Sequence, residues 1–253
     1  MTFINQLQRF ELFTGGLSPG IRFKGSENSL YRYNIEPRKD SFNTNPLYSD
    51  LDERQIEKIA RSNSKIMAIL DKYNISLKIN SEELEKLKHG HLMNTRVTAA
   101  KIYSALNQEL KSEVNLSDLQ QAAMLHDYGK ILIPEKILNK SSTLTANERE
   151  IIELHSELGY ELLKSQGVKP EVLTLVKYHH QIPSTRGYPE AGNDFEYSIT
   201  SQILTAADKY SALTEKRSYK DALSKDDALK IIQNDVDKGL ICREVFDALK
   251  QVV

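Results

Sequence analysis

Three short pieces mark the stretch from Leu125 to Asp208: LHDYGK at residues 125–130, YHH at 178–180 and TAAD at 205–208. All six histidines of the chain lie between residues 89 and 180, a window of about a third of its length. Histidines scattered over a surface would not crowd in this way. Imidazole and carboxylate are ligands for zinc, iron or manganese, and a single cysteine cannot build a thiolate-bound structural zinc site. The stretch therefore predicts a metal site.

Length and composition set the class of protein. With 253 residues and 40% hydrophobic content, the chain can bury a sizeable core as one large domain, alone or with a smaller appendage. Its net charge of −1 provides no large basic excess to attract duplex nucleic acid or an acidic membrane surface. Cys242 stands alone, which excludes an intramolecular disulfide and fits a reducing compartment. No apolar run is long enough to span a bilayer, and residues 1–13 contain charged side chains where a signal peptide would be apolar. We therefore expect a cytoplasmic protein without a membrane partner.

The chain changes character near residue 49. Residues 1–48 are rich in Gly, Pro, Ser and Asn, which predicts an irregular N-terminal arm or small subdomain, with a disordered tail as the alternative. Apolar residues then recur at three- and four-residue spacing, which is typical of helices. We interpret 49–80 as a helical linker or N-terminal helix and 81–253 as an all-α catalytic domain.

Helix-start signals divide the second part of the chain. Capping residues or a proline predict helix starts at Asn80, Ser117, Thr145, Pro170 and Ser224, with further helices from about Tyr197 and Arg243. The first of these helices is long and carries His91. The second ends at His126, the third bears His155, and the fourth ends at the pair His179-His180.

Each candidate ligand has an ordinary explanation when it is taken alone. His91 and His155 could be satisfied histidines of a helical core, and Lys130 could be a solvated lysine near a helix C-terminus. His126 and Asp127 project in different directions from a regular helix, so both reach one site only where the helix ends or distorts, which Gly129 allows.

The histidine pair and Asp208 are harder to explain without a cation. His179 and His180 would repel each other if both were protonated, whereas metal coordination requires neutral rings. Asp208 follows the small apolar run at residues 205–207, where a lone carboxylate is costly.

The order of these residues resembles the HD-GYP branch of the HD-domain metal-dependent phosphohydrolases. The resemblance runs from about His91 to the C-terminus, roughly two thirds of the chain. Each motif is weak alone, but their order is specific. The motifs are His126-Asp127-Tyr128-Gly129-Lys130, the segment from Ile133 to Lys140, Leu144-Thr145, His155 with Gly159, His179-His180, Gly187-Tyr188-Pro189, Asp208 and Arg217-Ser218-Tyr219-Lys220.

The resemblance implies an HD-domain helical bundle of five to seven helices, preceded here by a less regular N-terminal segment. It implies two or three iron or manganese ions and the hydrolysis of cyclic di-GMP. Lys130 would contact the scissile phosphate, Arg217 and Lys220 the phosphate or guanine, and Tyr188 the pocket wall. Asp127 would bridge two ions and act with Lys130 in catalysis. The implied metal ligands are His91, His126, Asp127, His155, His179, His180 and Asp208.

Several positions depart from the family pattern. Members with three metals carry a glutamate one helical turn before the first histidine, where this chain has Leu87, so we predict two divalent ions. Iron or manganese is expected, with zinc, magnesium or nickel as alternatives. The usual glutamate after the histidine pair is Gln181, and the second aspartate of the Asp-x-x-Asp pattern is Ser211. These departures leave the ligands in place but leave the substrate open.

The sequence therefore predicts a metal-dependent phosphodiesterase acting on a cyclic dinucleotide, cyclic di-GMP before others. Two alternatives remain: an HD phosphohydrolase acting on another nucleotide or phosphomonoester, and a catalytically silent nucleotide-binding signalling module. A homodimer stays open as the oligomeric state.

Overall fold

The computed structural model describes residues 51–88, 91–183, 187–192, 195–216 and 221–253. In these ranges the regular structure is helical, with no β-strand. The elements are α2 (Glu53–Ser62), α3 (Ser64–Lys72), α4 (Ser81–Lys88), α5 (His91–Ala105), α6 (Gln108–Ser112), α7 (Leu116–Leu125), the 3-10 helix η1 (Tyr128–Leu132), α8 (Glu135–Leu138), α9 (Ala146–Glu153), α10 (His155–Lys164), α11 (Pro170–Tyr178), α12 (Ile199–Thr214), α13 (Lys225–Asp237) and α14 (Arg243–Val252). The predicted all-α fold is confirmed.

Most predicted helix starts agree with the structure. Thr145 and Glu148 form a reciprocal capping box at α9, Pro170 occupies the first turn of α11, and Ser224 caps α13. The predicted start at Ser117 was wrong by two residues. α7 is capped by Asn115, whose side chain accepts a hydrogen bond from the N–H of residue 118, because asparagine caps a helix as well as serine does.

One helix predicted to be continuous is divided, whereas α4 ends at Lys88, α5 begins at His91, and residues 89–90 lie outside the described residues. α9 ends at Glu153 and α10 begins at His155. The imidazole Nδ1 of His155 donates to the Ile152 carbonyl at 2.7 Å, and a side-chain donor there competes with the backbone of a continuous helix. His155 therefore lies at a helix start.

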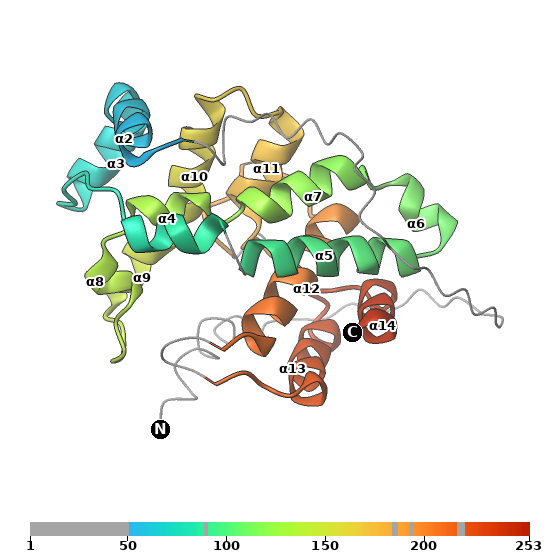
Figure 1. Cartoon of the computed structure of the whole chain (residues 1–253). Coiled ribbons are helices and arrows are strands. Elements are labelled where there is room, and N and C mark those ends of the chain that lie inside the picture. The colour runs from blue at the N-terminus through green and yellow to red at the C-terminus, as the bar shows by residue number, and fades with distance from the viewer. Residues whose placement is uncertain (1–50, 89–90, 184–186, 193–194, 217–220) are drawn as a thin grey trace. The chain divides into compact units, whose positions relative to one another are not determined.

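The centre of the helical body is α5. It packs against α7, α12 and α14, and Figure 1 shows it running between α7 and the pair α12 and α14. Fully buried alanines allow these helices to approach closely; they are Ala99, Ala122, Ala123, Ala206 and Ala207. The packing sets the N-terminal end of α5 beside the C-terminal end of α7 and the middle of α12.

Gly129 allows the backbone of η1 to cross α10 in direct contact. A Cβ atom on Gly129 would lie 1.9 Å from the carbonyl oxygen of His155 and 2.5 Å from the backbone nitrogen of Gly159. Only glycine permits an approach this close. The crossing places residues 126–130 next to the start of α10.

The helices α2 and α3 belong to the same compact unit, which covers Asp52–Val253. The side chain of Asn63 donates to the Glu161 carbonyl on α10 at 3.2 Å. The irregular arm predicted for 1–48 lies outside the described residues, and the division at residue 80 stays a proposal. No helix within the described ranges combines the length and the apolar character needed to cross a membrane.

Candidate metal centre

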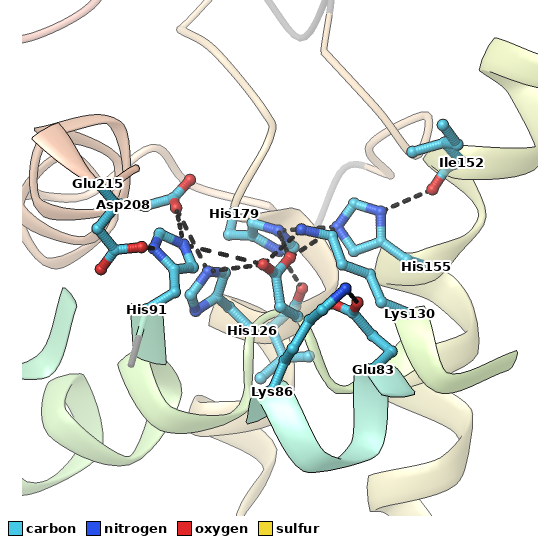
Figure 2. Close-up of polar contacts among 12 residues, drawn as sticks. Glu83, Lys86, His91, His126, Lys130, Ile152, His155, His179, Asp208 and Glu215 are labelled. Atoms are coloured by element: carbon cyan, nitrogen blue, oxygen red, sulfur yellow. Dashed lines mark hydrogen bonds and ion pairs between the residues drawn. The ribbon is translucent and has the colours of Figure 1, made fainter. Parts of the chain in front are cut away.

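The predicted ligands come together from several helices of the compact unit. His91 begins α5, His126 caps the end of α7, His155 begins α10, and His179 caps the end of α11. Asp208 lies within α12. Asp127 precedes η1, and His180 follows His179 in the chain. Figure 2 shows the imidazoles of His91, His126, His155 and His179 converging, with the Asp208 carboxylate beside the first two.

Three of the imidazoles are held in the same way. The Nδ1 atoms of His126, His155 and His179 each lie 2.7–3.0 Å from the backbone carbonyl three residues earlier. A carbonyl only accepts, so each Nδ1 carries the proton and each Nε2 of a neutral ring keeps a free lone pair. Histidines that bind metals are oriented by this kind of contact.

The carboxylate of Asp127 lies between two groups of histidines. Its Oδ1 is 3.4 Å from the Nε2 of His155 and 3.9 Å from that of His179. Its Oδ2 is 3.5 Å from the Nε2 of His126 and 3.9 Å from that of His91. The two oxygens of one carboxylate thus face opposite sets of ligands.

Each set contains enough ligands to hold an ion. The first set comprises His91, His126 and Asp127, and the second comprises Asp127, His155, His179 and His180, with potential ligand atoms inside each set within 4.8 Å of one another. Asp208 extends the first set, because its Oδ1 lies 3.0 Å from the Nε2 of His91 and 3.5 Å from that of His126.

The donor atoms fit a bound cation. The Nε2 atoms of His155 and His179 are 3.1 Å apart, although neither carries a proton when Nδ1 is protonated in a neutral ring. Two lone pairs at that distance repel unless a positive charge lies between them. The Nε2 atom of His126 is buried and has no hydrogen bond to any described residue. A buried polar atom without a partner is costly, and a metal ion satisfies it.

The protonation states of the second set also favour metal binding. Burial lowers the pKa of His155 to about 4 and that of His180 to about 3. Burial, followed by the neighbouring histidines, also holds the pKa of His179 well below its usual range. These rings are therefore neutral at neutral pH, which is the form that coordinates metals.

The first set is more strongly charged. Burial opposes protonation of His91, but the carboxylates of Asp208 and Glu215 outweigh it and raise the pKa of the ring to about 9. Burial also opposes ionisation of Asp127, yet Lys130 and His126 keep its pKa well below the usual range. His126 and His91 do the same for the pKa of Asp208 against the same burial effect. Both carboxylates are thus anionic at neutral pH.

Lys130 lies beside the Asp127 carboxylate. Its Nζ is 2.5 Å from the Oδ2 of Asp127, and its side chain remains 19% exposed. The ammonium therefore reaches from the solvent-accessible side of the centre to its middle. α4 packs beside η1, and Figure 2 draws its Glu83 and Lys86 in the same close-up.

The Gly-Tyr-Pro turn at residues 187–189 contacts the histidine pair. His180 and Tyr188 form an isolated antiparallel bridge, and their ring centroids lie 4.6 Å apart. A Cβ atom on Gly187 would lie 2.0 Å from the His180 carbonyl oxygen. The buried amide of Gln181 accepts from the N–H of Gly187 at 3.2 Å and donates to the Pro189 carbonyl. Gln181 thus shapes the turn that presents Tyr188 beside His180.

Sequence reasoning missed Glu215, the C-cap residue of α12. Its Oε2 lies 3.2 Å from the Nδ1 of His91. The available signal was its position seven residues after Asp208, about two turns along one helix. Arg217 and Lys220, predicted to contact substrate, lie outside the described residues.

Comparison with known proteins agrees with this geometry. The family model described as HD domain matches residues 78–243, which is most of the chain. This chain belongs to the HD-domain family. It is 34% identical over 140 residues to a cyclic di-GMP phosphodiesterase of Thermotoga maritima, covering 54% of this chain and 38% of that protein.

Two further relatives have related names. The cyclic di-GMP phosphodiesterase response regulator RpfG of Xanthomonas campestris is 37% identical over 47% of this chain and 32% of its own length. The 3'3'-cGAMP-specific phosphodiesterase 3 of Vibrio cholerae is 31% identical over 53% of this chain and 29% of its own. This HD-domain chain lies in the HD-GYP branch, and its matches span about a third of the length of these relatives. The family and the His/Asp cluster together indicate divalent metal binding.

Proposed function

We propose that this chain is a metal-dependent phosphodiesterase that hydrolyses a cyclic dinucleotide, with cyclic di-GMP as the first candidate substrate. The observation that carries the proposal is the position of Asp127, whose two carboxylate oxygens face two separate sets of histidines. A carboxylate between two ligand sets is the arrangement that a pair of adjacent cations requires. The names of the relatives supply the substrate class.

The proposed ligands give each of two ions a nitrogen-rich set. His91, His126 and Asp208 would hold one ion, His155, His179 and His180 the other, and Asp127 both. Imidazole and carboxylate ligands suit iron or manganese, with zinc, magnesium and nickel as alternatives. The chemistry that such ions supply when bound is a hydroxide nucleophile near neutral pH and Lewis acidity toward phosphate oxygens.

The side chains around the centre have their own roles in this proposal. Lys130 places a positive charge at the open side of the carboxylate bridge, where it opposes the negative charge that develops on the phosphate. Tyr188 presents an aromatic ring beside His180, and an aromatic face binds a nucleobase by stacking. Arg217 and Lys220 are proposed to bind the phosphate or the guanine.

A second substrate, 3'3'-cGAMP, is favoured by a specific finding. The Vibrio cholerae relative is named for that cyclic dinucleotide, at an identity similar to those of the cyclic di-GMP enzymes. The two molecules differ in one base, so the ligands of the centre do not distinguish between them.

The test is turnover by the metal-loaded chain. The purified protein is stripped with a chelator and reloaded with Mn²⁺ or, without oxygen, with Fe²⁺. It is then incubated separately with cyclic di-GMP, 3'3'-cGAMP and p-nitrophenyl phosphate. We expect a linear dinucleotide or mononucleotides from at least one cyclic substrate, and no product from the Asp127→Ala variant.

The other outcomes identify the alternatives. Turnover of the phosphomonoester alone would indicate a different HD phosphohydrolase. Bound metal without turnover of any substrate would leave a nucleotide-binding module, and a wild-type chain that binds no metal would overturn the proposal.

A further inference from the structure

His91 is held differently from the other imidazoles of the centre. His126, His155 and His179 each direct Nδ1 to a carbonyl three residues earlier, on their own segment of chain. The Nδ1 of His91 instead lies 3.2 Å from a carboxylate oxygen of Glu215, which comes from another helix. Figure 2 shows the Glu215 carboxylate on the opposite side of the His91 ring from His126.

Glu215 is itself held in place. Its Oε1 accepts a hydrogen bond from the side-chain amide of Asn94 at 2.5 Å, and its backbone N–H donates to the Ser211 carbonyl at 3.0 Å. Asn94 lies on α5, three residues after His91, so the two face the same side of that helix. One carboxylate therefore contacts two neighbouring positions of α5 from the end of α12.

We propose that Glu215 is a positioning residue that fixes the ring of His91 with Nδ1–H toward itself and Nε2 toward the metal centre. Carboxylate–histidine–metal arrangements orient the ring and make it a stronger ligand. The inference rests on the proposed metal centre. It assigns Glu215 the task that backbone carbonyls perform for the other three histidines.

The position of Glu215 also fits the departure from the family pattern at Ser211. Ser211 stands where the Asp-x-x-Asp pattern has its second carboxylate, and its hydroxyl oxygen is buried without a hydrogen bond to any residue in the described part of the chain. Glu215, the C-cap residue of α12, lies four residues later and places a carboxylate beside His91.

A purely structural role of Glu215 would give a different experimental result. If Glu215 only ties α12 to α5, then removing Asn94 should have the same effect as removing Glu215. The Asn94→Ala variant breaks the amide contact and leaves the Glu215 carboxylate beside His91, so it serves as the matched control.

The experiment measures metal binding directly, not activity. Equilibrium dialysis with Zn²⁺ or Mn²⁺ gives the affinity of each equivalent in wild type, Glu215→Ala, Glu215→Gln and Asn94→Ala. We expect Glu215→Ala to weaken one equivalent by about 10- to 100-fold, the usual effect of removing such a partner, and to leave the other equivalent unchanged. Glu215→Gln keeps the side-chain volume and should weaken the same equivalent by less. Asn94→Ala should bind almost as wild type does.

A second readout reports on the ring itself. In the Zn²⁺-loaded protein, ¹⁵N NMR of the histidines should show His91 bound through Nε2 with a proton on Nδ1, and Glu215→Ala should lose that proton signal. Wild-type affinity in both Glu215 variants, or an equal loss in Asn94→Ala, would overturn the inference. A wild-type chain that binds no metal would overturn the proposed function instead, so the two failures are distinguishable.

Discussion

The tautomers of three histidines in this centre are determined by backbone geometry. His126, His155 and His179 sit at helix ends, where their Nδ1 atoms reach a carbonyl three residues earlier. Their Nε2 atoms are therefore available without rearrangement. Ligands oriented in advance bind at a lower entropic cost than ligands that must be ordered on binding.

Replacing Lys130 tests whether metal binding and catalysis can be separated. In Lys130→Ala we expect both metal equivalents to remain and the rate to fall by about 10²-fold or more. The variant loses a positive charge that would stabilise the negative charge developing on the phosphate in the transition state. Metal analysis and steady-state turnover of the same preparation provide the measurement. Lys101→Ala, which removes an exposed lysine of α5, is the control and should keep the wild-type rate. An unchanged rate in Lys130→Ala would contradict the role proposed for this lysine.

At the residue scale, the sequence indicated which residues belong to the centre better than it indicated which of them contact one another. Adjacent pairs such as His126-Asp127 and His179-His180 are visible in the sequence, and the structure brings both pairs into the centre. Glu215 was not predicted, because its partner His91 lies far away in the chain and no local pattern links the two. Contacts between distant segments depend on helix packing, which sequence periodicity does not determine.

Among the elements, the crossing of η1 and α10 is a close contact beside the centre. In Gly129→Ala the new methyl group would meet the His155 carbonyl oxygen at 1.9 Å, so the two segments must separate. We expect a loss of unfolding free energy of about 3 kcal/mol or more, at the upper end of overpacking effects, together with weaker metal binding. Denaturant unfolding and metal analysis measure the two effects.

Gly167→Ala is the matched control for that substitution. Gly167 has a positive φ of 76° and nothing within 4 Å of an added Cβ, so the cost is conformational, about 1–2 kcal/mol. Metal binding should be unchanged there. Equal stability losses in the two variants would show that the crossing is not tightly packed.

A buried ion pair joins α12 to α13. The ammonium of Lys209 contacts the carboxylate of Asp235, and both side chains are less than 10% exposed. Asp235→Ala leaves a buried ammonium without this partner and should cost about 3–5 kcal/mol in unfolding free energy. Asp247→Ala breaks the exposed ion pair between Asp247 and Lys250 on α14 and should cost about 1 kcal/mol or less in unfolding free energy. Urea titrations of both variants test this difference, and similar midpoints would refute it.

Helix starts could be predicted from the sequence because capping is local. The capping box at Thr145 and the proline at residue 170 each depend on fewer than five consecutive residues. The division before His155 was not predicted. It depends on a hydrogen bond between the His155 ring and the Ile152 carbonyl, and an apolar pattern carries no signal for a side-chain bond of that kind.

Over the whole molecule, the centre links helices that are distant in the chain. Each of five helices, α5, α7, α10, α11 and α12, provides a candidate ligand or its flanking residue, and the buried alanines Ala99, Ala123 and Ala207 lie in three of them. The resemblance implied both the set of candidate ligands and a place for Asp127 between two ions, but not which histidines face each carboxylate oxygen. That division of the histidines follows from the η1 crossing, which only the folded chain displays.

Metal binding should therefore stabilise the entire helical unit. A ligand that binds only the folded state adds about 2.7 kcal/mol at a concentration 100 times its dissociation constant. For a domain of this size, that corresponds to a rise in Tm of about 5–10 °C. Differential scanning calorimetry of chelator-treated and Mn²⁺-loaded protein measures the shift. Asp127→Ala should fold with similar helix content by circular dichroism but show no shift, because its loss removes an oxygen from both ligand sets at once. A Tm that rises equally in Asp127→Ala and wild type would mean that the stabilising ions bind elsewhere on the chain.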